Sequence, residues 1–313
     1  MATDPKIITD TTERSNAPGW TVKQELDVWT RQVWGTLVYS SAYLAIIAMA
    51  EILVVQYVLS LPLSPAPLVG GLVTFAIYAN DRLIDTDTDV VSDPRRTAFV
   101  NRYRDILYVS AAVAYGLGVA IAALGGPLAF GMTLFPGVAW ILYGIEWIPS
   151  PRLPFQRVKE LLVVNSLLVA VAWSVPIVLV PLAFADRALS PTVLVVIWYF
   201  VLGTFVNAEV ANATDVASDR RNGVSTLPIA LGIHRTTYVL YIITLLMGIV
   251  PGLAVLAGYL SFTTATILAA GPLVLLVVLS RLKAVEEDDS IVVAAECTRL
   301  PVAALLLAAS VVV

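Results

Sequence analysis

The sequence predicts an all-α integral membrane protein, built as a bundle of nine transmembrane helices. Composition is the first observation behind this prediction: 58% of the 313 residues are hydrophobic and only 13% are charged. Soluble domains are typically about 45–50% apolar and about 25% charged. The second observation is that apolar segments recur along the whole chain, and a spanning helix needs about 20 mainly apolar residues.

The predicted spans follow one another closely, with breaks marked by proline and glycine, as at Leu61-Pro62 and Gly125-Gly126-Pro127. Residues 1–30 are polar and lack the apolar core of a secretory signal, so we expect a cytosolic lead-in there and one membrane domain over residues 31–313. The nine segments lie near residues 34–60, 67–84, 105–124, 127–145, 160–183, 191–212, 236–258, 263–282 and 291–313.

The distribution of basic residues predicts the orientation of this bundle. Lysine and arginine precede the first span and follow each even-numbered span, whereas among the other loops only the one after the fifth span is basic, through Arg187. The positive-inside rule therefore places the N-terminus and the even-numbered loops in the cytoplasm. The net charge of −4 argues against a nucleic-acid partner, and nothing in the sequence indicates the oligomeric state.

Two aspartate clusters stand where long apolar segments end. The first cluster is Asp81, Asp85 and Asp89, after the second predicted span, and the second cluster is Asp215 and Asp219, after the sixth. If each helix continues past the membrane surface, the i, i+4 and i+8 spacing places these carboxylates along one helix face. On the predicted topology both clusters reach the cytoplasmic side.

This arrangement favours a magnesium site that binds a diphosphate. Unpaired carboxylates at this spacing repel one another and are costly near hydrocarbon, whereas Mg²⁺ prefers oxygen ligands from carboxylates, waters and substrate phosphates. The five aspartates are thus predicted both to bind the metal and to act in catalysis, because the ions would neutralise charge on a departing pyrophosphate. Neighbouring arginines can bind phosphate oxygens in bidentate fashion, namely Arg82, Arg95, Arg96 and Arg220. The alternative is that each cluster is a solvated helix end and that the arginines are only the positive-inside signal.

The second cluster carries a resemblance to a known family. With the residues after it, through Gly223 and Thr226-Leu227-Pro228, it is similar to the DxxxD-R-x-x-G-x-x-T-L-P segment of the UbiA superfamily of intramembrane prenyltransferases. The first cluster resembles that family's NxxxDxxxD motif, except that Asp81 stands where the family generally has asparagine, with Asn80 one residue earlier.

The resemblance implies a polar cytosolic cap and a lateral, lipid-facing cavity. It also implies a Mg²⁺-dependent enzyme that ionises a polyprenyl diphosphate and transfers the prenyl group to a lipophilic acceptor, which is an aromatic ring, a lipid or a carotenoid. A third stretch is similar to a loop that brings tyrosine and basic residues close to the diphosphate; it contributes Tyr143, Arg152, Lys159 and Asn165.

Two other functions stay open at this point. A terpene cyclase of the same superfamily would use the same aspartates and quench the cation within its own chain. A transporter or a non-catalytic membrane binding protein is the other alternative, although a cation transporter should hold its carboxylates near the bilayer midplane, whereas these clusters lie at one edge.

Several polar and aromatic residues lie within the predicted spans. Asn212 and Glu209 either line the cavity and contact substrate or form hydrogen bonds between helices, and Glu51 is a further candidate of this kind. Glu296 and Arg299, three residues apart, are expected to form an internal ion pair. A second set either lines a prenyl channel or packs between helices: Trp140, Trp173, Trp198, Tyr199 and Phe205.

Overall fold

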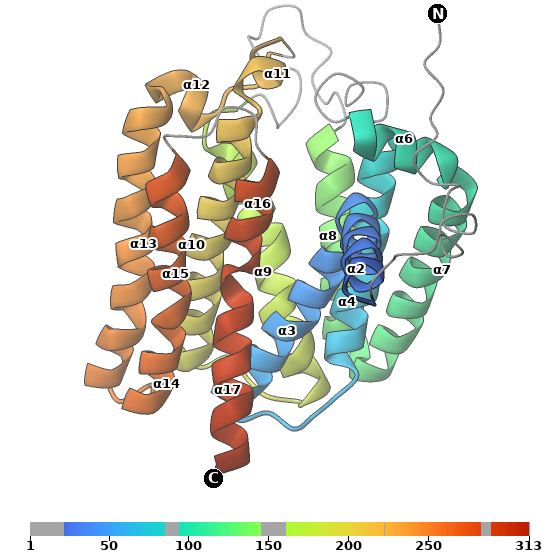
Figure 1. The fold of residues 1–313 in the computed structure, drawn as a ribbon. Coiled ribbons are helices and arrows are strands. Elements are labelled where there is room, and N and C mark those ends of the chain that lie inside the picture. Colours follow the sequence, from blue (N-terminus) through green and yellow to red (C-terminus); the bar gives the residue numbers. More distant parts are fainter. Residues whose placement is uncertain (1–21, 85–93, 145–160, 222, 283–288, 313) are drawn as a thin grey trace, which may run out of the picture.

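The computed structural model describes residues 22–84, 94–144, 161–221, 223–282 and 289–312, and every regular element in these ranges is a helix (Figure 1). The N-terminal half contains α2 (Val22–Tyr39), α3 (Ala42–Val58), α4 (Ala66–Ile84), α6 (Pro94–Arg102), α7 (Arg104–Ala122), η1 (Ala123–Gly125), α8 (Gly126–Gly144) and α9 (Val164–Phe184). The C-terminal half contains α10 (Pro191–Thr214), α11 (Val216–Arg221), α12 (Leu227–Leu231), α13 (Ile233–Leu256), α14 (Phe262–Leu268), α15 (Ala270–Arg281), α16 (Asp289–Glu296), η4 (Cys297–Arg299) and α17 (Leu300–Val312).

The all-α prediction is confirmed for the described residues, but the count of nine spans is not. Within the described ranges, six helical stretches are long and apolar enough to cross a membrane, or up to seven if α2 and α3, which meet at a bend of 78°, form one span. The first of the six runs through α7 and α8 together, and α4, which ends in Asn80, Asp81 and Arg82, is not among them. The polar cap and its cytosolic placement stay predictions.

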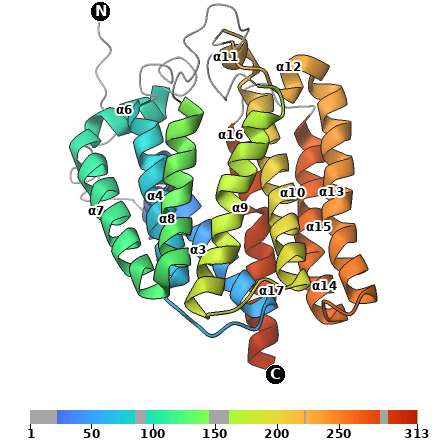
Figure 2. The ribbon, with the colours of Figure 1, turned by 180° about the vertical axis from the view of Figure 1, so that it is seen from behind.

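Helices α9 and α10 lie at the centre of the bundle. Figures 1 and 2 show α4, α7 and α8 on one side of this pair and α13 and α15 on the other. Of the apolar window of α10, 67% is buried, against 28% for α13. The outer helices expose large hydrophobic side chains instead, such as Leu117 on α7, Ile242 on α13 and Val277 on α15. Such faces suit contact with lipid chains rather than water.

Local sequence determines where α10 and α8 begin. Ser190 precedes α10, and its hydroxyl accepts a hydrogen bond from the amide of Val193 at 3.4 Å, with Pro191 in the first turn. Gly126 begins α8 with a φ of +83°, a backbone conformation that glycine adopts without steric cost. This residue lets the chain reverse direction so that α8 packs against α7.

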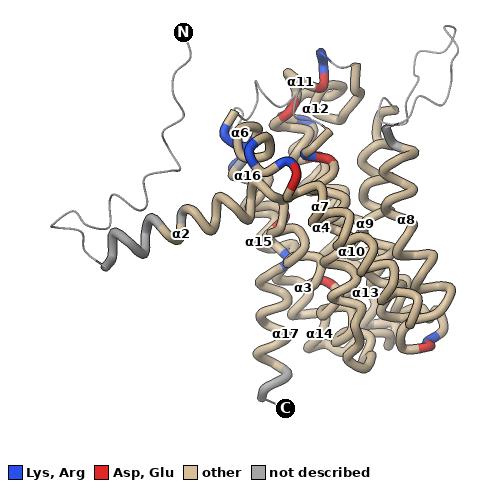
Figure 3. The backbone as a smooth tube through the Cα atoms, turned by 90° about the vertical axis from the view of Figure 1, so that its right-hand side faces the viewer, with Lys and Arg blue, Asp and Glu red and all other residues tan. Residues whose placement is uncertain are grey.

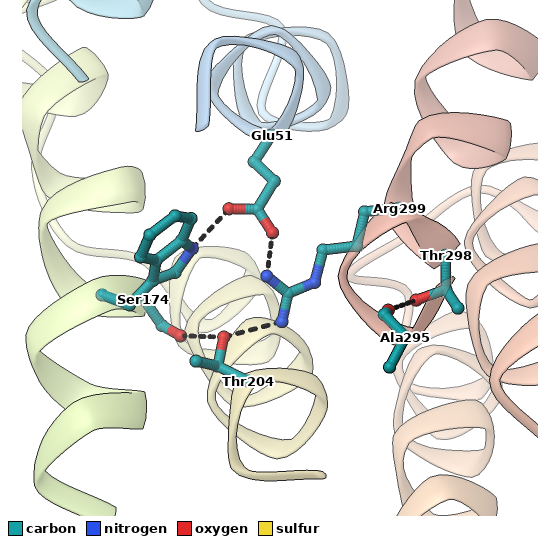
Figure 4. A network of polar contacts seen from close by, with 7 residues as sticks. Glu51, Ser174, Thr204, Ala295, Thr298 and Arg299 are labelled. Atoms are coloured by element: carbon teal, nitrogen blue, oxygen red, sulfur yellow. Dashed lines mark hydrogen bonds and ion pairs between the residues drawn. The ribbon is translucent and has the colours of Figure 1, made fainter. Parts of the chain in front are cut away.

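A buried ion pair joins two of the helical segments, α3 and η4, and it differs from the predicted one. Arg299 of η4 pairs with Glu51 of α3, and the two side chains are only 7% and 1% exposed (Figure 4). The expected pair between Arg299 and Glu296 is therefore wrong. Glu296 instead accepts a hydrogen bond from the hydroxyl of Tyr43. Long-range packing brings Glu51 to the guanidinium, and this overrides the local spacing.

The energetics of this pair can be tested directly. Replacing Arg299 alone by methionine leaves the Glu51 carboxylate buried without its cation, which should lower the free energy of unfolding by about 3–5 kcal/mol. Replacing both residues, as E51M/R299M, removes both charges and should be close to neutral. The melting temperature of the purified protein in detergent measures the difference, with R187M in the exposed loop after α9 as the control. Equal losses in the single and double variants would contradict the pairing.

Candidate functional site

The described parts of the two aspartate clusters lie at the same end of the bundle. Asp81 is in the last turn of α4, and Asp219 is in α11, directly after α10. Figure 3 shows that charged residues gather mainly at the end that carries α6 and α11. Asp85 and Asp89 lie outside the described residues, so the spacing of the first cluster stays a prediction.

The second cluster spans a helix break. Asp215 is the C-cap of α10, with φ −100° and ψ 12°, and α11 begins at the next residue. The amide of Asp219 nonetheless donates to the carbonyl of Asp215 at 2.9 Å, which is the i to i+4 bond of a helix. The predicted continuation of one helix is thus wrong in detail, but helical spacing between the two aspartates is preserved.

The predicted phosphate-binding residues lie in different parts of the structure. Arg95, at the start of α6, and Arg220, in α11, are exposed at the charged end, with Arg96 partly buried beside Arg95. The Arg82 guanidinium donates from Nε to the hydroxyl of Ser41 at 3.3 Å, which connects the end of α4 to the bend between α2 and α3. Tyr143 falls in the last turn of α8, and the two remaining predicted cations lie outside the described residues: Arg152 and Lys159.

Asn165 and Asn212 belong to a hydrogen-bond network between α9 and α10. The Asn212 amide donates to the Ser166 hydroxyl at 3.1 Å, and that hydroxyl contacts Glu209 Oε1 at 2.6 Å and Asn165 Oδ1 at 2.8 Å. Glu209 is fully buried. These contacts favour the interhelical interpretation over cavity lining for Glu209 and Asn212, and the substrate contacts of the two asparagines stay predictions.

An apolar cavity of about 280 Å³ lies between α4, α8 and α9, with Ile52 contributed by α3. Along α4 its lining extends from Val69 to Asp81, which corresponds to about 18 Å of helix. Among the described residues of this lining, Asp81 is the one charged residue, and the Trp140 indole donates to its Oδ1 at 3.0 Å. The cavity is therefore lined mainly by apolar side chains and has a carboxylate at the charged end of the bundle.

Two further polar features occur within the cavity wall. The Thr133 hydroxyl is buried and has no hydrogen-bond partner among the described residues, so it is available to a bound molecule. Pro136 and Pro176 also line the cavity. A proline within a helix lacks the N–H for the carbonyl four residues earlier, which here belongs to Met132 or Ala172, two more residues of the wall.

Of the predicted channel aromatics, Trp140 and Trp173 line the cavity, whereas Trp198 is 58% exposed on the outside and Tyr199 is buried in the core with Phe205. Sequence reasoning missed Tyr78, whose ring lies 5.8 Å from that of Trp173 in an edge-on arrangement. Its position three residues before Asp81 places both on one face of α4, so the spacing could have revealed it.

The carboxylates at this end are suitable magnesium ligands by chemistry, because Mg²⁺ prefers hard oxygen donors. Within the described part of the chain, no three His, Cys, Asp or Glu side chains come together as a metal site. A complete set would require Asp85 and Asp89, which are not described. The donor types therefore fit the metal, and the assembly of the full set stays a prediction.

Most of the chain matches the model of one protein family. The model of the UbiA prenyltransferase family matches residues 38–295. The chain belongs to the UbiA prenyltransferase family. It is accordingly a multi-pass membrane protein and a prenyltransferase, as the sequence resemblance predicted. A comparison with curated protein sequences gives no significant match.

Solved structures support the same fold. A UbiA homologue from Archaeoglobus fulgidus bound to GPP and Mg²⁺ matches with a TM-score of 0.64 and 14% identity, over 88% of this chain and 98% of that one. The apo UbiA homologue from Aeropyrum pernix K1 matches with a TM-score of 0.64 and 15% identity, over 85% and 98%. A structure concerned with digeranylgeranylglyceryl phosphate synthase matches with a TM-score of 0.57 and 13% identity, over 89% and 97%.

The contact between Trp140 and Asp81 gives a testable prediction for the charged end of the cavity. Trp140→Phe keeps the ring but removes the indole donor, and hydrogen bonds to charged groups contribute about 1.5–3 kcal/mol. We expect the Kd of inorganic pyrophosphate in the presence of Mg²⁺ to rise about tenfold, as measured by calorimetry. W198F, on the exposed outer face, is the matched control. An unchanged Kd for W140F would show that this hydrogen bond does not organise the site.

Proposed function

We propose that this protein is a Mg²⁺-dependent intramembrane prenyltransferase that ionises a polyprenyl diphosphate and transfers the prenyl group to a lipophilic acceptor. The observation that carries the proposal is the cavity, an apolar space that follows α4 over about 18 Å of helix, with Asp81 as the one charged residue among its described lining residues. An isoprenoid diphosphate has the same division into an apolar tail and an anionic head. The Archaeoglobus homologue bound to GPP and Mg²⁺ supports this assignment.

In this proposal the prenyl tail lies in the cavity and the diphosphate lies at the charged end. When bound, Mg²⁺ would neutralise charge on the departing pyrophosphate, and the aspartates of the two clusters would hold it. Arg95 and Arg220, exposed at this end, would bind phosphate oxygens. Trp140 orients the Asp81 carboxylate through its indole N–H.

The reaction then proceeds by exchange of bonds at the allylic carbon. The C–O bond to the diphosphate breaks, and pyrophosphate leaves with the electron pair. An electron pair of the acceptor forms the new bond to the allylic carbon, and the acceptor loses a proton to solvent at the charged end. The rings of Tyr78, Trp140 and Trp173 line the cavity, where aromatic faces stabilise a developing cation and apolar walls exclude water.

The same proposal assigns an orientation in the membrane. The N-terminus, the two aspartate clusters and the loops with most basic residues would face the cytoplasm, because α4 and α10 both end at the charged side of the bundle (Figures 1 and 3). The acceptor in this proposal is an aromatic ring, a lipid or a carotenoid.

The proposed roles of the aspartates can be tested by substitution. D85A and D215A should each lower Mg²⁺-dependent pyrophosphate release by about 100-fold or more, since each removes a ligand that stabilises the leaving group. D105A is the matched control, because Asp105 is an exposed carboxylate in the first turn of α7. Release that survives in both D85A and D215A would contradict the assigned site.

Acceptor dependence separates the transferase from a cyclase. Purified protein with geranylgeranyl diphosphate and Mg²⁺, analysed by mass spectrometry, should give a prenylated product only when an acceptor is added. A cyclic hydrocarbon formed without any acceptor would overturn the transferase proposal in favour of a terpene cyclase.

A further inference from the structure

The indole of Trp173 connects the cavity to the buried ion pair. Its ring belongs to the cavity wall, and its Nε1–H donates to Glu51 Oε2 at 2.6 Å. The other carboxylate oxygen, Oε1, pairs with Arg299. One carboxylate oxygen of Glu51 therefore accepts the hydrogen bond of the indole, and the other pairs with the guanidinium of Arg299 (Figure 4).

The rest of the network holds the guanidinium in place. Arg299 Nη2 donates to Thr204 Oγ1 at 2.7 Å, and that hydroxyl lies 3.2 Å from the Ser174 hydroxyl. Ser174 follows Trp173 directly on α9. The contacts thus start at Trp173 and return to its neighbour through α3, η4 and α10, a closed arrangement that restricts rotation of the indole.

The energetic cost of this network points to a role beyond stability. Removing two charges from water is expensive, and a buried ion pair is often no more stabilising than apolar residues of similar volume. What such a pair supplies is a fixed geometry for the groups bonded to it. Here the group that reaches the cavity is the Trp173 ring, which also contacts Tyr78 edge-on, with an interplanar angle of 73°.

We propose that Glu51 and Arg299 are positioning residues that hold the Trp173 indole in the cavity wall, and that Trp173 determines how long a lipophilic chain the cavity accepts. The proposal rests on the proposed function, because it concerns the tail of the same substrate. A tryptophan side chain occupies a large area, so its removal would enlarge the cavity toward α3 and η4. Loss of the hydrogen bond between the Trp173 indole and Glu51 would by itself let the ring turn and would open part of the same space.

The experiment measures the Kd values of geranyl diphosphate and geranylgeranyl diphosphate with Mg²⁺, using purified protein in nanodiscs, and compares their ratio among variants. W173A should shift the ratio toward the longer diphosphate by about tenfold, within the range of pocket-size discrimination. W173F, which keeps a ring but removes the N–H, and E51M/R299M should each shift it the same way by a smaller factor. W198A, on the exposed outer face, is the control and should keep the wild-type ratio.

The combined variant W173F/E51M/R299M distinguishes positioning from general stability. If the pair acts through the indole N–H, adding E51M/R299M to W173F should produce no further shift, because the shared interaction is already absent. Additive shifts would show that the pair does not act through Trp173. W173F carries no change of charge, so it tests the hydrogen bond between Trp173 and Glu51 even if E51M/R299M fails to fold.

Each remaining outcome is also decisive. A wild-type ratio in W173A would overturn the specificity role of Trp173 while leaving the proposed function intact. Failure of the wild-type protein to bind either diphosphate would contradict the proposed function, and this inference with it.

Discussion

The cost of placing charge among apolar helices governs where the ionisable groups of this protein lie and what they do. Asp81 lies at the end of α4, where its carboxylate accepts a hydrogen bond from the indole of Trp140. Glu51 lies far from either end of α3, and its charge is compensated by the ion pair with Arg299. The first arrangement leaves a carboxylate in the lining of an apolar cavity, at the charged end of the bundle, and the second fixes part of the cavity wall. Both consequences follow from the need to give a carboxylate a partner where it is wholly or partly removed from water.

The cavity depends on features of α4, α8 and α9 that are separate in sequence. Ala and Gly residues let the helices approach closely, as where a Cβ on Gly70 would lie 2.3 Å from Ile52 Cδ1. Prolines within α8 and α9 interrupt their hydrogen bonding at the wall. Aromatic rings also line the cavity, and among its described lining residues Asp81 is the one carboxylate, at the charged end of the bundle.

Hydropathy predicted the helical segments well, because each long apolar run contains a described helix, but the count of nine spans is not confirmed among the described residues. The position of Asp81 and Asp215 where apolar segments end also identified them as carboxylates at helix ends. Sequence could not reveal the partner of Arg299, since local spacing favoured Glu296 whereas Glu51 lies 248 residues away. The break after Thr214 and the burial of Tyr199 likewise depend on tertiary packing, which a periodic pattern does not encode.

The measurement that tests the central claim most directly is an experimental structure of the protein with Mg²⁺ and a non-hydrolysable thiolo analogue of geranyl diphosphate. The prenyl chain should lie between α4, α8 and α9, beside Tyr78 and Trp173, with the phosphorus atoms beyond Asp81 at the charged end. A prenyl chain bound elsewhere on the bundle, with this cavity empty, would contradict the assignment of the cavity as the substrate site.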